Sequence, residues 1–326
     1  MTVVLLTGVT TPLGTALAKA LVEDSDIQLV IGVGVERTPP AQPASDSFIY
    51  ESWDLGKERN IRRMLFGSCR ERGVTHVVHS ALHRSPLDEG GHVHRLNVES
   101  TRHLLRFCER HPTIRRFVFR SDVEVYRHDH LHPTLVREDQ PLELSVAAKQ
   151  RVRDRVEADL TVCTHMGMSS LSICVLRLAE VFAPESGSQL HDWLLSRIAI
   201  RPLGYNPMVN LLSIDDAVAA LIAGVKGEAQ GVFNIPGHDS LPVKRLAELA
   251  GVRPVALPDP MLSPLYRWRE RVRRTEFTYE MNDGRFHTSD LLDGTRAMKE
   301  LGYEPQHGIN FSAVRQRRRL TAFRRL

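Results

Sequence analysis

The start of the chain constrains its fold more than any other segment, because a short apolar run leads through a glycine-containing loop directly into a helical pattern. Val3–Thr7 is a continuous apolar run, which is typical of a strand buried on both faces. The loop Gly8–Gly14 follows, and Thr15–Val22 then carries apolar residues at helical spacing. Such a loop can hold a phosphate group with the free N–H groups and the positive dipole end of the helix. A plain turn between a strand and a helix is the alternative interpretation.

The alternation of strand and helix patterns continues through the first half of the chain. Further strands are predicted at Gln28–Val33, Thr75–His79, Arg116–Phe119 and Leu171–Arg177, and helices at Ile61–Arg72, Val98–Arg110 and from Ser145 to His165. Short strands separated by helices imply right-handed crossover units and a parallel sheet. We therefore predict an α/β protein with a doubly wound parallel sheet, the Rossmann fold.

Prolines change this pattern after Arg177. They interrupt the chain repeatedly between Pro184 and Pro264 and leave room only for short elements. We predict a Rossmann domain over residues 1–180, to which residues 205–236 return. A smaller irregular substrate-binding lobe is predicted over residues 181–326, and it ends in an arginine-rich tail.

Composition excludes several classes of protein. With 42% apolar and 25% charged residues, the chain of 326 residues can bury a large core and is not of the disordered class. No apolar stretch approaches the roughly 18 residues of a membrane-spanning helix, and the N-terminus lacks the basic segment of a signal peptide. The four cysteines have irregular spacings and form no CxxC pair, so we expect a reducing, cytoplasmic environment.

Arginine carries most of the positive charge, because only six of the 43 basic residues are lysines. Most of these arginines alternate with acidic residues. We therefore attribute the high arginine content to biased codon usage and do not expect a nucleic-acid partner. Arginines nevertheless gather around Trp268 in Leu265–Arg274, and at the terminus at Arg315, Arg317, Arg318, Arg319, Arg324 and Arg325. Both segments fit either solvated helices or contact with an anionic membrane surface or an acidic partner. We also leave open the interpretation that the protein forms a homodimer.

Histidines cluster twice, in His76–His94 and in His128–His132. A metal site needs three or four ligands held in a fixed arrangement, whereas the second cluster lies in a predicted surface loop. We therefore interpret these side chains as solvated and predict no metal site.

Several short motifs occur in a characteristic order. Gly8–Gly14 is similar to a TGxxGxxG loop, Trp53–Leu55 to an xDL motif and His79–Leu82 to HLAA, and Asn97 begins a match to NVxGTxxLL. Further matches follow at Arg116–Ser121, Val125–Tyr126, Leu176–Pro184, Ser213–Val218 and Gly231–Ile235. This order resembles that of the extended short-chain dehydrogenase/reductases, the NAD-dependent epimerase/dehydratase family. The shared order is more specific than any single motif.

The resemblance implies an NAD-binding oxidoreductase that acts, if active, on a hydroxyl-bearing substrate such as a nucleotide sugar or another anionic molecule. The cofactor-binding residues that it implies are Gly8, Thr10, Thr11, Pro12, Leu13, Gly14, Glu36, Arg37, Asp54, Leu55, Ser80, Ala81, Leu82, Asn97 and Lys149. The family's ribose-binding acid falls on Gly34 or on Glu36, depending on the alignment. Glu36 favours NAD, whereas Gly34 with Arg37 nearby would accept a 2′-phosphate. We favour NAD and leave NADP open.

Thr11 departs from the family loop, because it stands where a middle glycine allows the backbone to approach the diphosphate. The added side chain should weaken this fit, although its hydroxyl could instead donate to a phosphate oxygen.

The catalytic residues depart further. The family uses Tyr-xxx-Lys on one helix, and here the resemblance places Ser145 and Lys149 at these positions. An aliphatic hydroxyl has a far higher pKa than a phenol, so Ser145 is a poor proton shuttle. The assisting serine or threonine of the family corresponds to Asp122.

Asp122 and Lys149 suggest two interpretations. They could form a buried ion pair in the former active site, which would offset the cost of burying the lysine. Alternatively, Asp122 only caps the turn that follows it.

Three functions therefore compete. The first is an active oxidoreductase or epimerase with an altered proton relay. The second is a catalytically impaired protein that binds the dinucleotide as a sensor or structural element, which the missing tyrosine favours. The third is a scaffold or membrane-surface protein that uses its basic tail, which the retained Lys149 disfavours.

Overall fold

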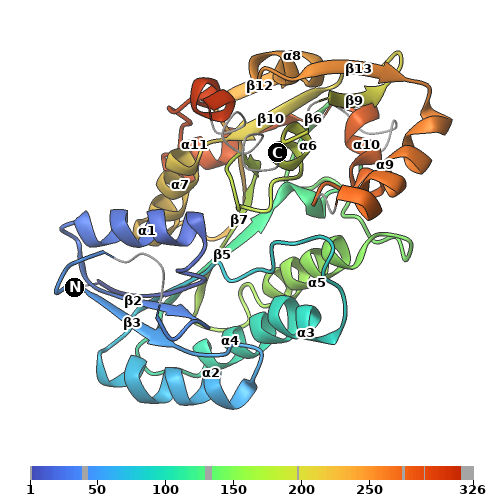
Figure 1. Cartoon of the computed structure of the whole chain (residues 1–326). Coiled ribbons are helices and arrows are strands. Elements are labelled where there is room, and N and C mark those ends of the chain that lie inside the picture. Colours follow the sequence, from blue (N-terminus) through green and yellow to red (C-terminus); the bar gives the residue numbers. More distant parts are fainter. Residues whose placement is uncertain are drawn as a thin grey trace.

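A computed structural model describes residues 2–38, 43–128, 134–196, 198–273, 276–289 and 291–316. Its main feature is a sheet of seven parallel strands in the order β11-β7-β5-β4-β1-β2-β3 (Figure 1). These strands are β1 (Thr2–Thr7), β2 (Ile27–Gly34), β3 (Phe48–Ser52), β4 (His76–His79), β5 (Arg116–Asp122), β7 (Ser172–Leu178) and β11 (Gly231–Ile235). The sheet grows in opposite directions from β1 and β4, which creates a crevice at the carboxyl ends of these two strands. The predicted Rossmann fold is confirmed.

Helices cover both faces of this sheet (Figure 1). One face carries α1 (Pro12–Glu23) and α7 (Ile214–Lys226), and the other carries α2 (Glu58–Met64), α4 (Ser100–Cys108) and α5 (Gln150–Thr164). Alternate side chains of each strand therefore enter different cores. In β1, Val4 and Leu6 pack toward α1, whereas Val3 and Leu5 pack toward α2 and α4. This double burial explains the unbroken apolar run at the start of the sequence.

Two predicted helices are interrupted. Helix α2 ends at Met64 and continues as a π-helical turn over Leu65–Cys69. The short helix α3 (Gly91–His94) and a second π turn over Arg95–Glu99 precede α4. Such turns commonly adjust how a helix meets a binding site.

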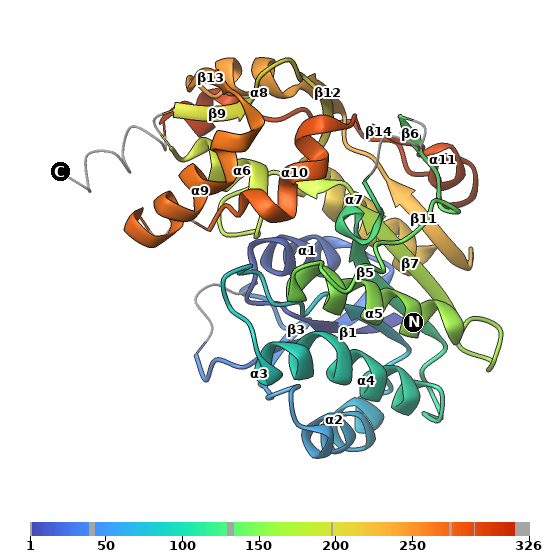
Figure 2. The ribbon, with the colours of Figure 1, turned by 90° about the vertical axis from the view of Figure 1, so that its right-hand side faces the viewer.

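The remaining elements form a smaller lobe beside the carboxyl ends of the sheet (Figure 2). Its strand pairings are β12-β10-β8, β13-β9 and β14-β6, from β6 (Leu135–Val136), β8 (Glu180–Val181), β9 (Ile198–Pro202), β10 (Met208–Leu212), β12 (Asp239–Pro242), β13 (Arg253–Leu257) and β14 (Leu291–Leu292). Its helices are α6 (Gln189–Leu194), α8 (Val243–Leu249), α9 (Asp259–Arg273), α10 (Tyr279–His287) and α11 (Thr295–Leu301). A separate core around Trp193, Tyr266 and Phe286 supports this lobe. The domain limits drawn from the sequence stay a prediction.

No helix within the described ranges combines the length and the apolar content needed to cross a bilayer. The cytoplasmic location stays a prediction.

The predicted start of the helix at Ser145 is wrong. Helix α5 begins at Gln150, and Lys149 is its N-cap residue with an extended ψ of 150°. Ser145 lies in an exposed turn, where its N–H donates to Glu143 Oε1 over 2.8 Å and its Oγ accepts the Ala147 N–H over 3.2 Å. These local hydrogen bonds compete with helix formation. Ser145 and Lys149 therefore do not share a helix face, contrary to the prediction.

Candidate cofactor site

A pocket of about 400 Å³ opens at the carboxyl ends of β1, β2 and β4. The predicted cofactor residues that line it are Gly8, Thr10, Thr11, Asp54, Leu55, Ala81 and Leu82. Val33, Gly34, Val35, Trp53, Gly56, Lys57, His92, Arg95 and Leu96 complete its walls. Its size fits part of a dinucleotide, and its walls are largely apolar with a few polar and charged groups.

Two glycines give the phosphate loop its shape. Gly8 has a φ of +75°, and a Cβ there would lie 2.9 Å from backbone atoms of Ser80 and Ala81. A Cβ on Gly14 would collide with the Gly8 carbonyl, so this glycine lets the loop close onto α1. Pro12 occupies the first turn of α1, where a missing N–H costs nothing, and Leu13 is buried beneath the loop.

Thr11 is the N-cap of α1. Its Oγ1 donates to the Gly8 carbonyl over 2.8 Å and accepts the Gly14 N–H over 3.0 Å. The hydroxyl is thus used within the loop, so the alternative in which it donates to a phosphate oxygen is not supported. The loop also offers a ligand one N–H fewer, because Gly14 donates to Thr11.

The two candidate ribose-binding positions, Gly34 and Glu36, lie close together at the end of β2. Gly34 is the last residue of the strand, and it lines the pocket without a side chain. The Glu36 carboxylate turns back toward this gap, since its Oε2 lies 2.9 Å from the place of a Cβ on Gly34. Tyr50 fixes this segment by donating its hydroxyl to the Glu36 carbonyl over 2.5 Å. Arg37 is exposed beside it.

A chain of hydrogen bonds positions the pocket wall at Ala81 and the buried Ser80 that precedes it. Thr7 Oγ1 accepts both of their N–H groups and also bonds His79 Nδ1 over 2.8 Å. The other ring nitrogen of His79 bonds Thr101 Oγ1 over 2.9 Å. Burial lowers the pKa of His79 to about 3, so the ring is neutral. His79 therefore has a structural role behind the pocket.

Asn97 and Asp54 also organise the walls. The Asn97 side chain accepts the His83 N–H over 2.8 Å, and Asp54 accepts the Gly56 N–H over 3.0 Å. Asp54 pairs with Lys57 over 3.1 Å at the pocket edge.

Helix α5 presents a row of buried charges to the carboxyl end of β5. Arg151 binds both carboxylate oxygens of Glu124 over 2.9 Å, and Arg155 pairs with Asp122. One turn further, Asp159 accepts bonds from Arg177 at 2.6 and 3.0 Å. All of these side chains are at least nine-tenths buried. We call the row Arg151, Arg155 and Asp159 with these partners the α5 charge ladder.

The predicted ion pair between Asp122 and Lys149 is wrong. Lys149 Nζ lies 3.1 Å from Glu280 Oε2 and remains partly exposed at the start of α5. Asp122 instead pairs with Arg155, and its Oδ1 accepts the Glu124 N–H over 3.1 Å. Asp122 therefore caps the turn that follows it, as the second interpretation predicted, but capping is not its only contact because it also pairs with Arg155. The catalytic roles predicted for Ser145, Lys149 and Asp122 stay a prediction.

Tyr126 lies at the other end of the ladder, where its hydroxyl is engaged within the core. Its hydroxyl donates to Asn234 over 2.6 Å and accepts from Arg177 over 3.0 Å. Burial raises the pKa of Tyr126 to about 12, despite the nearby guanidinium. This hydroxyl is a structural bond within the core.

Sequence reasoning missed Arg151 and Arg155. Their spacing of four residues within a helical pattern, next to Val152 and Val156, could have identified one inward-facing row. The usual expectation that arginines are exposed argued against this interpretation.

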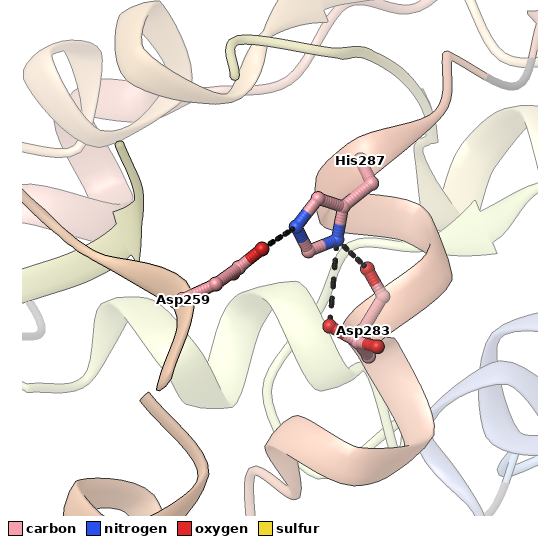
Figure 3. Close-up of side chains that lie close together, drawn as sticks. All are labelled: Asp259, Asp283 and His287. Atoms are coloured by element: carbon pink, nitrogen blue, oxygen red, sulfur yellow. Dashed lines mark hydrogen bonds and ion pairs between the residues drawn. The ribbon is translucent and has the colours of Figure 1, made fainter. Parts of the chain in front are cut away.

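A second cluster of charged groups joins α9 to α10 (Figure 3). His287 Nε2 lies 2.8 Å from Asp259 Oδ2, and its Nδ1 lies 2.8 Å from the Asp283 carbonyl. Both ring nitrogens face oxygen acceptors, so both must carry protons to satisfy them. Burial lowers the pKa of His287, but the Asp283 carbonyl and the Asp259 carboxylate outweigh it and raise the pKa above its ordinary value. The arrangement fits a charged clamp better than a metal site.

The two arginine-rich segments are only partly described. Arg274 and Arg317–Arg325 lie outside the described residues, as do His130 and His132. On α9, Arg267 donates to Glu280 over 2.8 Å, and Trp268 is 59% exposed.

The comparisons with known proteins agree with this architecture. The model of the NAD dependent epimerase/dehydratase family matches residues 4–235. An uncharacterized protein of Mycobacterium tuberculosis and one of Mycobacterium bovis are each 26% identical over 311 residues, with 93% of this chain and 80% of theirs covered.

Solved structures of sugar-nucleotide enzymes share the fold. UDP-glucose 4-epimerase of Thermotoga maritima, crystallised with UDP-glucose, has a TM-score of 0.72 at 17% identity and covers 99% of this chain and 100% of its own. UDP-glucuronic acid 4-epimerase of Bacillus cereus, in complex with UDP-glucuronic acid and NAD, has a TM-score of 0.70 at 16% identity, covering 98% and 99%. dTDP-glucose 4,6-dehydratase of Bacillus anthracis, in complex with NAD, has a TM-score of 0.69 at 14% identity, covering 99% and 97%.

Proposed function

Because the chain belongs to the NAD-dependent epimerase/dehydratase family, we propose that it binds NAD at the Gly8–Gly14 loop but lacks the family's proton relay. In this proposal it is a dinucleotide-binding protein with impaired hydride transfer, acting as a sensor or structural element. NAD, when bound, would supply a hydride acceptor. The protein's own residues would bind and orient it.

The shape of the pocket fits a dinucleotide. Gly8 and Gly14 remove side chains where the loop approaches Ala81 and α1, which leaves the helix N-terminus open to a phosphate. Glu36 brings a carboxylate to the end of β2, where it can accept bonds from the adenosine ribose hydroxyls. The same carboxylate would repel a 2′-phosphate, which favours NAD over NADP.

The observation that carries the proposal is the α5 charge ladder. We infer that Arg151 and Arg155 take the helix face that holds Tyr-xxx-Lys in the family, since they have the same spacing and face the end of β5. A guanidinium stays protonated at neutral pH and cannot exchange protons as a phenol does. Asp122, in place of an assisting hydroxyl, is engaged by Arg155. A general acid or base needs a proton that it can give or take near working pH.

Calorimetric titration of the full chain with NAD, NADH, NADP and NADPH tests the binding half of this proposal. We expect saturable heat with NAD or NADH and weaker binding of the two phosphorylated forms. No heat with any of the four at millimolar concentration would refute it.

A turnover assay tests the second part of the proposal, the impaired hydride transfer. Stoichiometric protein is mixed with NAD and UDP-glucose or UDP-glucuronic acid, and NADH absorbance and epimerised products are followed. We expect neither NADH nor epimerised sugar. Turnover at ordinary enzyme rates with either sugar would show that the ladder does not replace a working relay.

A second candidate function is contact of α9 with an anionic membrane surface. The exposed apolar residues Met261, Trp268 and Val272 are spaced seven and four residues apart, which places them on one face of the helix. Arg267 and Arg271 are exposed on the same helix. An apolar stripe flanked by arginines is suited to the headgroup region of an anionic bilayer.

Co-sedimentation with vesicles tests this candidate. We expect binding to phosphatidylglycerol vesicles that weakens with salt, no binding to phosphatidylcholine vesicles, and a loss of binding in Trp268→Ser. Met168→Ser is the matched control, because Met168 is 73% exposed on the other lobe. Equal sedimentation of wild type and Trp268→Ser would reject α9 as the contact.

A further inference from the structure

Arg95 brings a cation to the loop pocket that no residue in the described ranges neutralises. Its side chain lines the pocket and is exposed, and neither a hydrogen bond nor an ion pair joins it to another described residue. Lys57, the lysine in the same walls, is already paired with Asp54 over 3.1 Å. Arg95 therefore keeps its charge and its several N–H donors available to a molecule in the pocket.

The segment that carries Arg95 is anchored to α5. Gly90, just before α3, donates its N–H to the Gln150 side chain over 2.8 Å, and its carbonyl accepts from the same side chain over 3.0 Å. At the other end of α3, His94 Nδ1 lies 2.9 Å from Oδ1 of the buried Asp154. The backbone at Arg95 is thus held in place before any ligand arrives. Binding through its free side chain need not pay for ordering this segment.

Arg95 shares its pocket with the phosphate loop. His92 and Arg95 lie three residues apart in α3 and the π turn that follows, a spacing that puts both on one face, and both line the pocket. Gly91 between them leaves room for the guanidinium, since a Cβ there would lie 3.3 Å from Arg95 Nη1. Thr10 and Thr11 of the loop line the same space of about 400 Å³. A ligand held by the loop therefore has Arg95 in its surroundings.

We propose that Arg95 is a second anchor for the dinucleotide, with its guanidinium bound to the diphosphate of NAD. This inference rests on the proposed NAD binding. Arg95 lies outside the motifs that carry the family resemblance, the nearest of which begins at Asn97. A guanidinium fork matches the geometry of phosphate oxygens and binds them with charge-assisted hydrogen bonds. The anchor offsets the N–H that Thr11 withdraws from the loop by accepting the Gly14 N–H.

Titration calorimetry of the full chain with NAD and with ADP tests the anchor, because ADP carries the adenosine and the diphosphate without the nicotinamide. In Arg95→Met we expect the affinity for both ligands to fall about tenfold or more, since a charge-assisted bond is lost. Arg95→Lys should retain part of the affinity. Arg102→Met is the matched control, since Arg102 is a surface arginine on α4 that pairs with Glu157, and it should bind as wild type does.

Salt and heat give two further readouts. The difference in ADP affinity between wild type and Arg95→Met should shrink between about 50 mM and about 500 mM sodium chloride, because salt screens an exposed charge. A loss of stacking between the guanidinium and the adenine would persist at high salt. The ligand-free Arg95→Met protein should melt within about 2 °C of wild type, since Arg95 has no partner in the described part of the chain.

Each failure has a distinct meaning. Wild type that binds neither NAD nor ADP would refute the proposed function together with the anchor. Wild type that binds, with Arg95→Met affinities for both ligands within about twofold, would overturn the anchor alone. An affinity difference that does not shrink with salt would also overturn it, and so would a ligand-free midpoint several degrees lower in Arg95→Met, because Arg95 would then be a structural residue.

Discussion

At the scale of single residues, the region where α5 faces the carboxyl end of β5 contains paired charges, which in the proposed function stand in place of a proton relay. Arg155 and Asp122 are each more than nine-tenths buried, and their pairing replaces the contact with Lys149 predicted from the sequence. A buried pair adds little net stability, but breaking it leaves an uncompensated charge.

Arg155→Met alone should therefore lower the free energy of unfolding by on the order of 3–5 kcal/mol. Adding Asp122→Asn should recover much of this loss, which urea unfolding of the four proteins in a double-mutant cycle would measure. The control cycle uses Lys149→Met and Glu280→Gln. This partly exposed pair should couple by less than about 1 kcal/mol. Additive effects of Arg155→Met and Asp122→Asn would contradict the paired arrangement.

Glu36 permits a second prediction at this scale. Glu36→Gln keeps the shape of the side chain but removes the charge that repels a 2′-phosphate. We expect the preference for NAD over NADP, measured as the ratio of dissociation constants, to fall about tenfold. Glu23→Gln, at the last residue of α1, is a charge-matched control. An unchanged ratio would show that Glu36 does not reach the ribose.

The residues of the loop pocket and those of the α5 charge ladder were not equally predictable from the sequence. The loop Gly8–Gly14, Asp54, Leu55, Ala81 and Leu82 are placed by local chain geometry, so a strand–loop–helix pattern locates them. Arg151 and Arg155 depend on where α5 begins, which is decided by the turn around Ser145. The partner of Arg155 depends on the packing of α5 against β5, which no local pattern encodes.

At the scale of secondary-structure elements, the His287 clamp connects α9 with α10 (Figure 3). The pKa of His287 is raised in the folded protein, so the clamp stabilises the fold fully below the unfolded pKa of about 6.5. This contribution is lost as the pH rises through the folded value.

His287→Gln should accordingly lower the thermal midpoint at low pH, and the difference from wild type should shrink as the pH rises. Thermal unfolding of both proteins across about pH 6 to pH 9 measures this. His238→Gln is the control, because His238 is an exposed histidine of the same lobe. A difference that stays constant with pH would contradict a protonated clamp.

At the scale of the whole molecule, the large sheet was predictable because its strands are buried on both faces. Continuous apolar runs such as Val3–Thr7 identify such strands, and helices of regular spacing separate them. The smaller lobe was not predictable in detail, since its two- to five-residue strands pair across long sequence distances. The buried core around Trp193 and Tyr266 holds these short strands together. Its residues follow no periodic pattern in the sequence.

In the proposed function, NAD occupies the loop pocket while the α5 charge ladder stays as it is. Hydrogen–deuterium exchange of the full chain with and without saturating NAD tests both halves in one measurement. We predict slower exchange in residues 8–17, 33–35, 53–57 and 81–96, which contain the pocket walls, and unchanged exchange across Gln150–Thr164. Unchanged exchange in residues 8–17 would contradict NAD binding at the loop, and changed exchange across Gln150–Thr164 would contradict an unaltered ladder.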